Sequence, residues 1–149
     1  MHKLAALLAV ALLTPAALAE DRASTQDAER LVHKAVDFLK AEGREKAFAE
    51  FSNPKGRFTY RDLYIFAKDF HGVTLAHGSH PELIGKNDID RKDSTGKLFI
   101  KEMIEVARSK GSGWIQYNWG NPVTGKDELK VTYVETVDDV VVGCGAFKP

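Results

Sequence analysis

The first part of the chain carries apolar residues at helical spacing. Between Ser24 and Gly43, six of them recur every three or four positions and predict one buried stripe along a helix: Ala28, Leu31, Val32, Ala35, Val36 and Leu39. Ser24 or Thr25 can cap the start of this helix, and Gly43 is a natural stop. A second, shorter helix is predicted over residues 44–52, and the Asn-Pro-Lys-Gly segment that follows ends it.

Beyond this segment the hydrophobic period changes to that of β-strands. Leu63–Lys68 and Val73–Ala76 read as a hairpin with a turn at residues 70–72. After a polar, irregular stretch, residues 95–111 predict another helix, with an apolar face formed by Phe99, Met103, Val106 and Ala107. Three more strands are predicted at Gly113–Trp119, Glu128–Val137 and Val140–Phe147.

This order of elements predicts an α+β fold. Hairpins rather than crossover helices connect most of the strands, which indicates an antiparallel sheet. We expect five antiparallel strands, a long helix before them, and one helix inserted between the second and third strands, as in PAS-like sensor folds. The chain shows no internal repeat and no linker between domains, so we expect one domain.

The N-terminal residues have the pattern of a secretory signal. His2 and Lys3 precede an apolar run from Leu4 to Leu13, and Ala17–Ala19 offers the small residues of a cleavage site. We therefore predict a signal peptide over residues 1–19, a single domain over residues 20–149 and a periplasmic location. An uncleaved anchor is the alternative, although the run is shorter than the roughly 20 apolar residues that span a bilayer.

Composition argues against several classes of function. The chain has 21 basic and 21 acidic residues, and nothing in it indicates the clustered positive charge that nucleic-acid binding requires. Cys144 is the only cysteine, so no internal disulfide can form, and its apolar strand predicts a buried thiol.

Motifs for catalysis and metal binding are missing from the sequence. It contains no Gly-x-Ser-x-Gly, no His-Glu-x-x-His and no Cys-x-x-Cys-His, so we expect no enzymatic activity and no cofactor. His71, His77 and His80 gather around one hairpin but lack the usual spacing of metal ligands. A metal site there is the minor alternative.

Both tryptophans of the chain lie on one predicted strand, Gly113–Trp119. Side chains alternate between the two faces of a strand, so Ile115, Tyr117 and Trp119 share a face, which we expect to line the core or a pocket. Buried Tyr and Trp need partners for their O–H and N–H groups, and a carboxylate ligand would supply acceptors. Ordinary core packing is the alternative for each aromatic residue.

Three segments together resemble a known family. They are LYIFAKDFHGVTLAHGSHPELIGKN, DSTGKLFIKEMIEVA and GWIQYNWGNPVTGKDELKVTYVETVDDVVVGCGAF, which combine an aromatic strand, an Asn-Pro turn, a Lys-x-x-Tyr strand and a closing Gly-x-Gly. They are similar to the single Cache domains of the second type, the extracytoplasmic sensor domains of bacterial chemoreceptors and histidine kinases. The resemblance implies a PAS-like fold and a cup that binds short carboxylates such as acetate, propionate, pyruvate or lactate.

The candidate site follows from this resemblance together with the residue pattern. Lys130 is the most suggestive cation for a carboxylate, because it lies inside a predicted strand. The resemblance favours His77, after the second strand, over the other histidines. Six residues are predicted to bind the ligand: Tyr64, His77, Tyr117, Trp119, Lys130 and Tyr133. Lys130 and Tyr133 have opposite strand parity, so both reach one pocket only if a bulge or strong twist intervenes. A solvated strand position is the alternative for Lys130.

Two hypotheses about function remain at this point. The chain is expected to end at Pro149, just past the last strand, which implies a freestanding sensor domain that hands its signal to a membrane histidine kinase or chemoreceptor. The alternative is a scaffold that keeps the fold without a ligand, with the Leu31–Leu39 helix as a homodimer or partner surface.

Overall fold

The computed structural model of the chain describes residues 22–148. Its helices are α2 (Thr25–Glu42), α3 (Arg44–Phe51), the single 3-10 turn η1 (Pro81–Leu83) and α4 (Phe99–Lys110). Its strands are β1 (Thr59–Tyr60), β2 (Leu63–Tyr64), β3 (Phe66–Asp69), β4 (Thr74–His77), β5 (Ser112–Gly120), β6 (Asp127–Val137) and β7 (Val140–Phe147). The predicted signal peptide, residues 1–19, lies outside the described residues.

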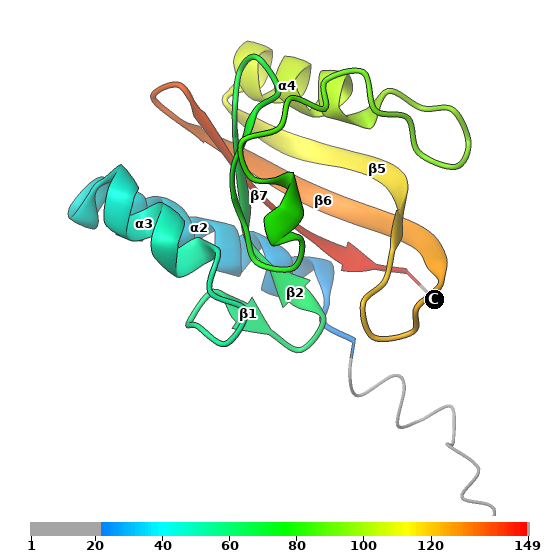
Figure 1. Cartoon of the computed structure of the whole chain (residues 1–149), viewed down its shortest axis with the longest axis horizontal. Helices are drawn as coiled ribbons and strands as arrows, with labels where there is room; N and C mark the ends of the chain where they lie inside the picture. Colours follow the sequence, from blue (N-terminus) through cyan, green and yellow to red (C-terminus); the bar gives the residue numbers. More distant parts are fainter. Residues whose placement is uncertain (1–21, 149) are drawn as a thin grey trace, which may run out of the picture.

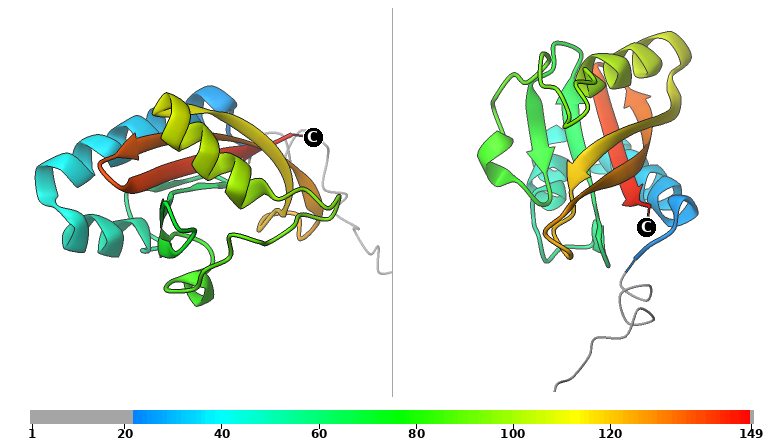
Figure 2. Two further views of the ribbon diagram at one scale, coloured as in Figure 1. Left: turned by 90° about the horizontal axis from the view of Figure 1, so that it is seen from above. Right: turned by 90° about the vertical axis from the view of Figure 1, so that its right-hand side faces the viewer.

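The main sheet has five antiparallel strands in the order β4-β3-β7-β6-β5. The helices α2 and α3 lie on one face of this sheet and α4 lies on the other (Figures 1 and 2). The helix α4 follows the second strand of the sheet in chain order and precedes the third. The predicted α+β architecture, with its inserted helix, is therefore confirmed.

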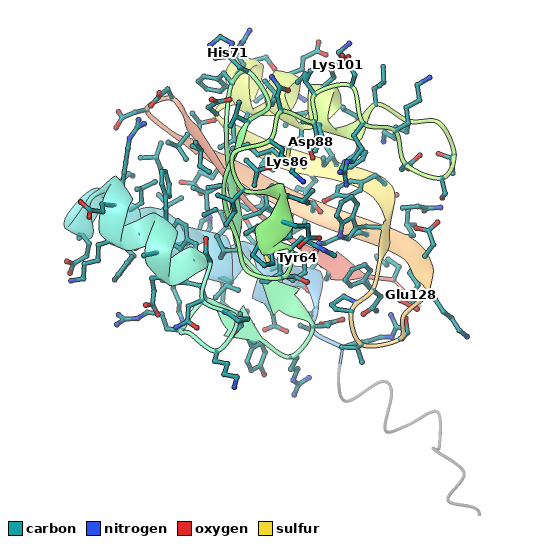
Figure 3. The ribbon with its side chains drawn as sticks, viewed as in Figure 1. Tyr64, His71, Lys86, Asp88, Lys101 and Glu128 are labelled. Atoms are coloured by element: carbon teal, nitrogen blue, oxygen red, sulfur yellow. The ribbon has the colours of Figure 1, made fainter. Side chains whose placement is uncertain are left out.

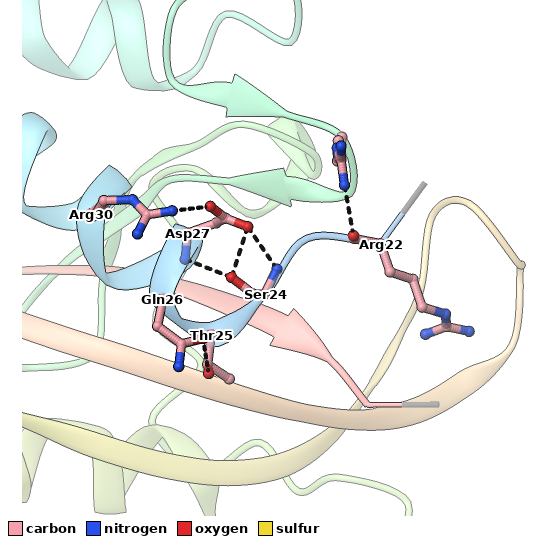
Figure 4. A network of polar contacts seen from close by, with 7 residues as sticks. Arg22, Ser24, Thr25, Gln26, Asp27 and Arg30 are labelled. Atoms are coloured by element: carbon pink, nitrogen blue, oxygen red, sulfur yellow. Dashed lines mark hydrogen bonds and ion pairs between the residues drawn. The ribbon is translucent and has the colours of Figure 1, made fainter. Parts of the chain in front are cut away.

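The long helix α2 begins with a capping box. The Ser24 hydroxyl oxygen accepts the Asp27 backbone N–H at 3.0 Å, and the Asp27 carboxylate accepts the Ser24 backbone N–H at 2.9 Å (Figure 4). All six residues of the predicted stripe are buried, and α2 packs against β6 and β7. This stripe is covered by the sheet. A homodimer or partner surface on this helix stays a prediction, and it would have to use the face opposite the stripe.

The opposite face of the sheet has its own apolar cluster. The helix α4 contacts β5 and β6 and contributes five buried residues: Phe99, Ile100, Met103, Ile104 and Ala107. Val106, predicted to share that face, is only partly buried, whereas Ile100 and Ile104 are buried in its place. The sheet thus separates two cores, and the one beneath α4 also contains polar side chains.

The predicted strand Leu63–Lys68 is divided in two. The β2 segment pairs with β1 in a small separate hairpin, whereas β3 pairs with β4 and β7. The chain therefore changes its pairing partners at Ile65, which belongs to neither strand. Arg61 forms the tight turn between β1 and β2 with a positive φ of 55°. This partner change depends on contacts with distant segments, which the local hydrophobic pattern does not encode.

Among residues 22–148, no helix combines the length and hydropathy needed to cross a bilayer.

Close packing against Phe66 explains why residue 143 is a glycine, and a substitution tests this. Gly143 lies opposite Phe66 in the β3–β7 ladder, and a Cβ built on it would lie 2.3 Å from Cζ of that ring. We expect Gly143→Ala to lower the free energy of unfolding by about 1–3 kcal/mol through overpacking, as measured by urea denaturation. Gly120→Ala is the control, because a Cβ there meets nothing within 4 Å. A Gly143→Ala protein as stable as the control would contradict this packing.

Candidate functional site

A small cavity lies in the core beneath α4. Its polar lining consists of Tyr64, Lys68, His77, Asp88, Tyr117, Trp119 and Lys130, and its apolar lining of Phe66, Leu83, Phe99, Ile100 and Met103 (Figure 3 labels Tyr64 and Asp88). The space open to the centres of water molecules is about 20 Å³. A single buried water needs roughly 10–15 Å³ by this measure, so the cavity as it stands has room for one or two water molecules, and an organic acid would enter only with movement of the lining side chains.

Lys130 places a cation inside this cavity. It lies on β6 between Tyr117 of β5 and Phe147 of β7, and its side chain is only 1% exposed. Its Nζ donates a hydrogen bond to the Tyr64 hydroxyl at 2.8 Å and lies 4.2 Å from the centre of the Tyr64 ring. A Cβ on Gly145 would lie 2.7 Å from Lys130 Cε, so glycine there leaves room for the lysine stem.

The charge of Lys130 is poorly compensated. Within residues 22–148, no acidic side chain lies within ion-pair distance of its Nζ, and burial lowers its pKa. The buried carboxylate of Asp62 attracts it only from a greater distance and does not line the cavity. A buried cation with only a hydroxyl and aromatic faces as partners retains a strong preference for an anion.

His77 is held in one tautomer. Its Nδ1 accepts the backbone N–H groups of Ser79 and His80 at 3.2 and 2.9 Å, so the ring proton is on Nε2. Burial, together with the positive charge of Lys130, lowers the pKa of His77 to about 2. His77 therefore lines the cavity as a neutral ring with one N–H donor.

Trp119 contributes a buried donor without a well-formed hydrogen bond. Its Nε1 makes no hydrogen bond of good geometry within the described part of the chain, although its interaction with the Tyr64 hydroxyl opposes the rise that burial causes in the pKa of that phenol. Tyr117, by contrast, has a hydrogen-bond partner, because its hydroxyl accepts from Thr132, and its ring stacks on Phe99 at 4.4 Å. An unsatisfied buried N–H costs about 1–3 kcal/mol, so the Trp119 indole marks where an acceptor would bind.

Lys68 and Asp88 form a buried ion pair in the cavity wall, and sequence reasoning missed both. Lys68 Nζ lies 2.8 Å from Asp88 Oδ1 and 2.7 Å from Thr74 Oγ1. Lys68 carried a signal, because it has the same strand parity as Tyr64 and Phe66 within an apolar run. Asp88 lies in the irregular loop before α4 and carried none.

The structure brings five of the six predicted site residues to one cavity: Tyr64, His77, Tyr117, Trp119 and Lys130. Tyr133 does not reach it. Its side chain lies on the α2 face of the sheet, where its hydroxyl is 3.4 Å from His33 and its ring packs on Trp114. No bulge reverses the strand parity between Lys130 and Tyr133, because the β5–β6 register is continuous there. Ligand binding by the other five residues stays a prediction.

Metal binding and thiol chemistry find no support in the described region. Among residues 22–148, no three His, Cys, Asp or Glu side chains gather closely enough to hold a metal ion. Cys144 is buried as predicted, and burial raises the pKa of its thiol to about 12. A thiol with that pKa is inert as a nucleophile.

The α+β fold is PAS-like, and its cavity combines an apolar lining with a few polar groups. The family model for "Single Cache domain 2" matches residues 14–148, and the chain belongs to this family. Its homologues are extracytoplasmic sensor domains of chemoreceptors and histidine kinases.

Two curated relatives show how such domains are used. The sensor histidine kinase MctS of Rhizobium johnstonii is 34% identical over 89 residues, which cover 58% of this chain and 19% of the kinase. The methyl-accepting chemotaxis protein CtpM of Pseudomonas aeruginosa is 34% identical over 71 residues, which cover 48% of this chain and 12% of the receptor. The chain thus matches less than a fifth of each relative's length.

Solved structures share the fold. A methyl-accepting chemotaxis protein from Vibrio parahaemolyticus has a TM-score of 0.71 at 25% identity, with 82% of this chain and 86% of that chain covered. A Cache chemosensory domain solved for its carboxylic acid recognition also has a TM-score of 0.71, at 23% identity, with 91% and 99% covered.

The buried, neutral His77 makes stability depend on pH. The folded protein does not protonate His77 until about pH 2, whereas the unfolded chain takes up this proton near pH 6.5. Stability contributed by the neutral ring is therefore present above pH 6.5 and is lost on acidification, by about 1.4 kcal/mol per pH unit.

We expect the unfolding free energy of His77→Asn to lack this pH-dependent contribution. Asn keeps an acceptor for the Ser79 and His80 backbone N–H groups but does not titrate. Urea unfolding of both proteins between about pH 4.5 and 7.5 isolates the histidine, since the other groups are common to both. If the difference in unfolding free energy between them stays constant over this range, His77 is not held neutral.

Proposed function

We propose that this domain is a periplasmic sensor that binds a short organic acid as its carboxylate and passes the signal to a partner protein. One observation carries the proposal: Lys130 is buried in a small cavity without an acidic partner within residues 22–148. An anion of a few heavy atoms would complete its coordination. Acetate, propionate, pyruvate and lactate are the candidate ligands.

The other donors support the same class of ligand. The cavity presents Lys130 Nζ, the His77 Nε2–H and the Trp119 Nε1–H, which makes no hydrogen bond of good geometry within residues 22–148. A carboxylate has two oxygens and about four acceptor positions, which matches several donors around a small space. Apolar residues from α4 would pack against the short carbon chain. A Cache domain of similar fold that recognises carboxylic acids adds to this support.

A route for the signal leads from the cavity strands to the chain ends. Glu128 lies beside Trp119 in the β5–β6 ladder and pairs with Arg22, just before α2, at 2.9 Å. The Lys148 backbone N–H donates to the Leu129 carbonyl at 2.8 Å. A ligand that shifts Trp119 or Lys130 would thus move both ends of the described chain, which lie near one another in Figure 1. A membrane histidine kinase or chemoreceptor is the partner we propose, and a homodimer through α2 would need the exposed face of that helix.

Lys130→Met tests the anion site. At a hundred times its dissociation constant, a ligand should stabilise the wild-type protein by about 2.7 kcal/mol in thermal unfolding. We expect Lys130→Met to show no such shift with acetate, propionate, pyruvate or lactate. Without ligand it should be at least as stable as wild type, because an apolar chain of similar length replaces a buried, unpaired charge.

Lys126→Met is the matched control, since Lys126 is exposed in the turn before β6 and should keep the wild-type shift. A Lys130→Met protein that still responds to the acid, or that is strongly destabilised without it, would identify Lys130 as a structural residue. A wild-type protein that responds to none of the four acids would favour the ligand-free scaffold.

Tryptophan fluorescence gives an independent readout. Trp119 lines the cavity, whereas Trp114 is 42% exposed on the other face. In Trp114→Phe the only indole left is in the cavity, so we expect the acid that stabilises the wild type to change its emission. In Trp119→Phe the remaining indole should not respond, and a response there would place the ligand elsewhere.

A further inference from the structure

The cavity contains a second buried lysine, Lys68, whose charge is paired with an acidic side chain. Lys68 on β3 is 4% exposed, and its Nζ lies 2.8 Å from Asp88 Oδ1. The other oxygen of Asp88 lies 3.5 Å from Arg91 Nε. Lys130 in the same cavity has no comparable partner. Two cations therefore line one small space, and residues 22–148 supply an anionic partner to only one of them.

Asp88 is held in this position by its own loop. Its backbone N–H donates to the Gly72 carbonyl at 3.3 Å, and the neighbouring Asn87 forms a bridge with Val73. These contacts fix the loop against the β3–β4 turn and direct the carboxylate towards Lys68 (Asp88 is labelled in Figure 3). The carboxylate is 10% exposed, so water does little to screen it.

The charges that line the cavity sum to one positive charge. Lys68 and Asp88 cancel, and Lys130 remains. His77 is neutral, and burial raises the pKa values of Tyr64 and Tyr117, which keeps both phenols protonated. Arg91 lies at the rim, 38% exposed, with its guanidinium over the Trp119 ring. A monoanion would neutralise this site, whereas a dianion would bring one uncompensated negative charge next to Asp88.

We infer that Asp88 is a specificity-determining residue that restricts the site to monocarboxylates by occupying Lys68. This inference rests on the proposed function, because it concerns which acids the same cavity accepts. Asp88 acts as an internal second carboxylate. Its removal would free Lys68 to pair with the second carboxylate of a short dicarboxylic acid.

Binding measurements on the wild-type protein distinguish the effect of a ligand's charge from the effect of its size. Each acid is titrated into the protein at neutral pH in a calorimeter. Binding of acetate or propionate tests the proposed function. The comparison of malonate with monomethyl malonate tests the inference about Asp88. The half ester is larger than malonate but carries a single charge. We expect the wild type to bind monomethyl malonate at least tenfold more tightly than malonate. Equal affinities, or binding of malonate alone, would overturn the role of Asp88.

Asp88→Asn should reverse this preference. The amide oxygen can still accept from Lys68, but the charge is gone, so we expect affinity for malonate to rise at least tenfold. Asp90→Asn is the matched control: Asp90 is on the same loop, its side chain is 78% exposed, and it pairs with Lys101 at the surface. It should leave malonate binding at the wild-type level.

The double variant Lys68→Met with Asp88→Asn identifies the cation responsible. It should lose the gain in malonate affinity, whereas a gain that persists would assign the effect to Arg91 and overturn the inference. If Asp88→Asn does not fold, the half-ester comparison in the wild type still decides. A wild type that binds acetate or propionate but fails these tests disproves only the inference, whereas one that binds no acid disproves the proposed function.

Discussion

The burial of one lysine ammonium group against the β-sheet explains how the residues around the cavity are arranged. Lys130 lies near the start of β6, is flanked by β5 and β7, and is only 1% exposed. The surrounding residues accommodate it in three ways: Gly145 leaves space for its stem, Tyr64 offers a hydroxyl, and the rings of Tyr64 and Phe147 face its ammonium. None of these supplies a negative charge, so the site remains incomplete by its own electrostatics.

The two faces of the sheet bury different kinds of side chain. The α2 face is covered by the apolar stripe of that helix and makes a continuous core. The α4 face mixes apolar residues with buried lysines, a neutral histidine and an unsatisfied indole. The helix α2 packs against β6 on the face opposite the cavity. A shift of the β6 backbone at Lys130 would therefore reach the surface that α2 contacts. This arrangement gives a physical basis for coupling a cavity to a helix.

In the proposed site, specificity would follow from charge balance as much as from shape. His77 is kept neutral by burial and by two backbone donors, so it offers a hydrogen bond without adding charge. Asp88 neutralises Lys68, and only Lys130 remains to attract an anion. A chemotaxis receptor domain shares this fold at 25% identity, so the framework persists while most side chains differ.

Periodicity and short-range chemistry predict the local elements. They predict the stripe and capping residues of α2, its stop at Gly43, the helix inserted among the strands, and the shared face of Tyr117 and Trp119. Three features appear only in the folded chain: the change of pairing partners at Ile65, the side chain of Tyr133 on the α2 face, and the contact between Lys68 and Asp88. These features depend on which distant segments become neighbours. Strand parity states that two side chains share a face, but the packing of the whole chain determines what that face meets.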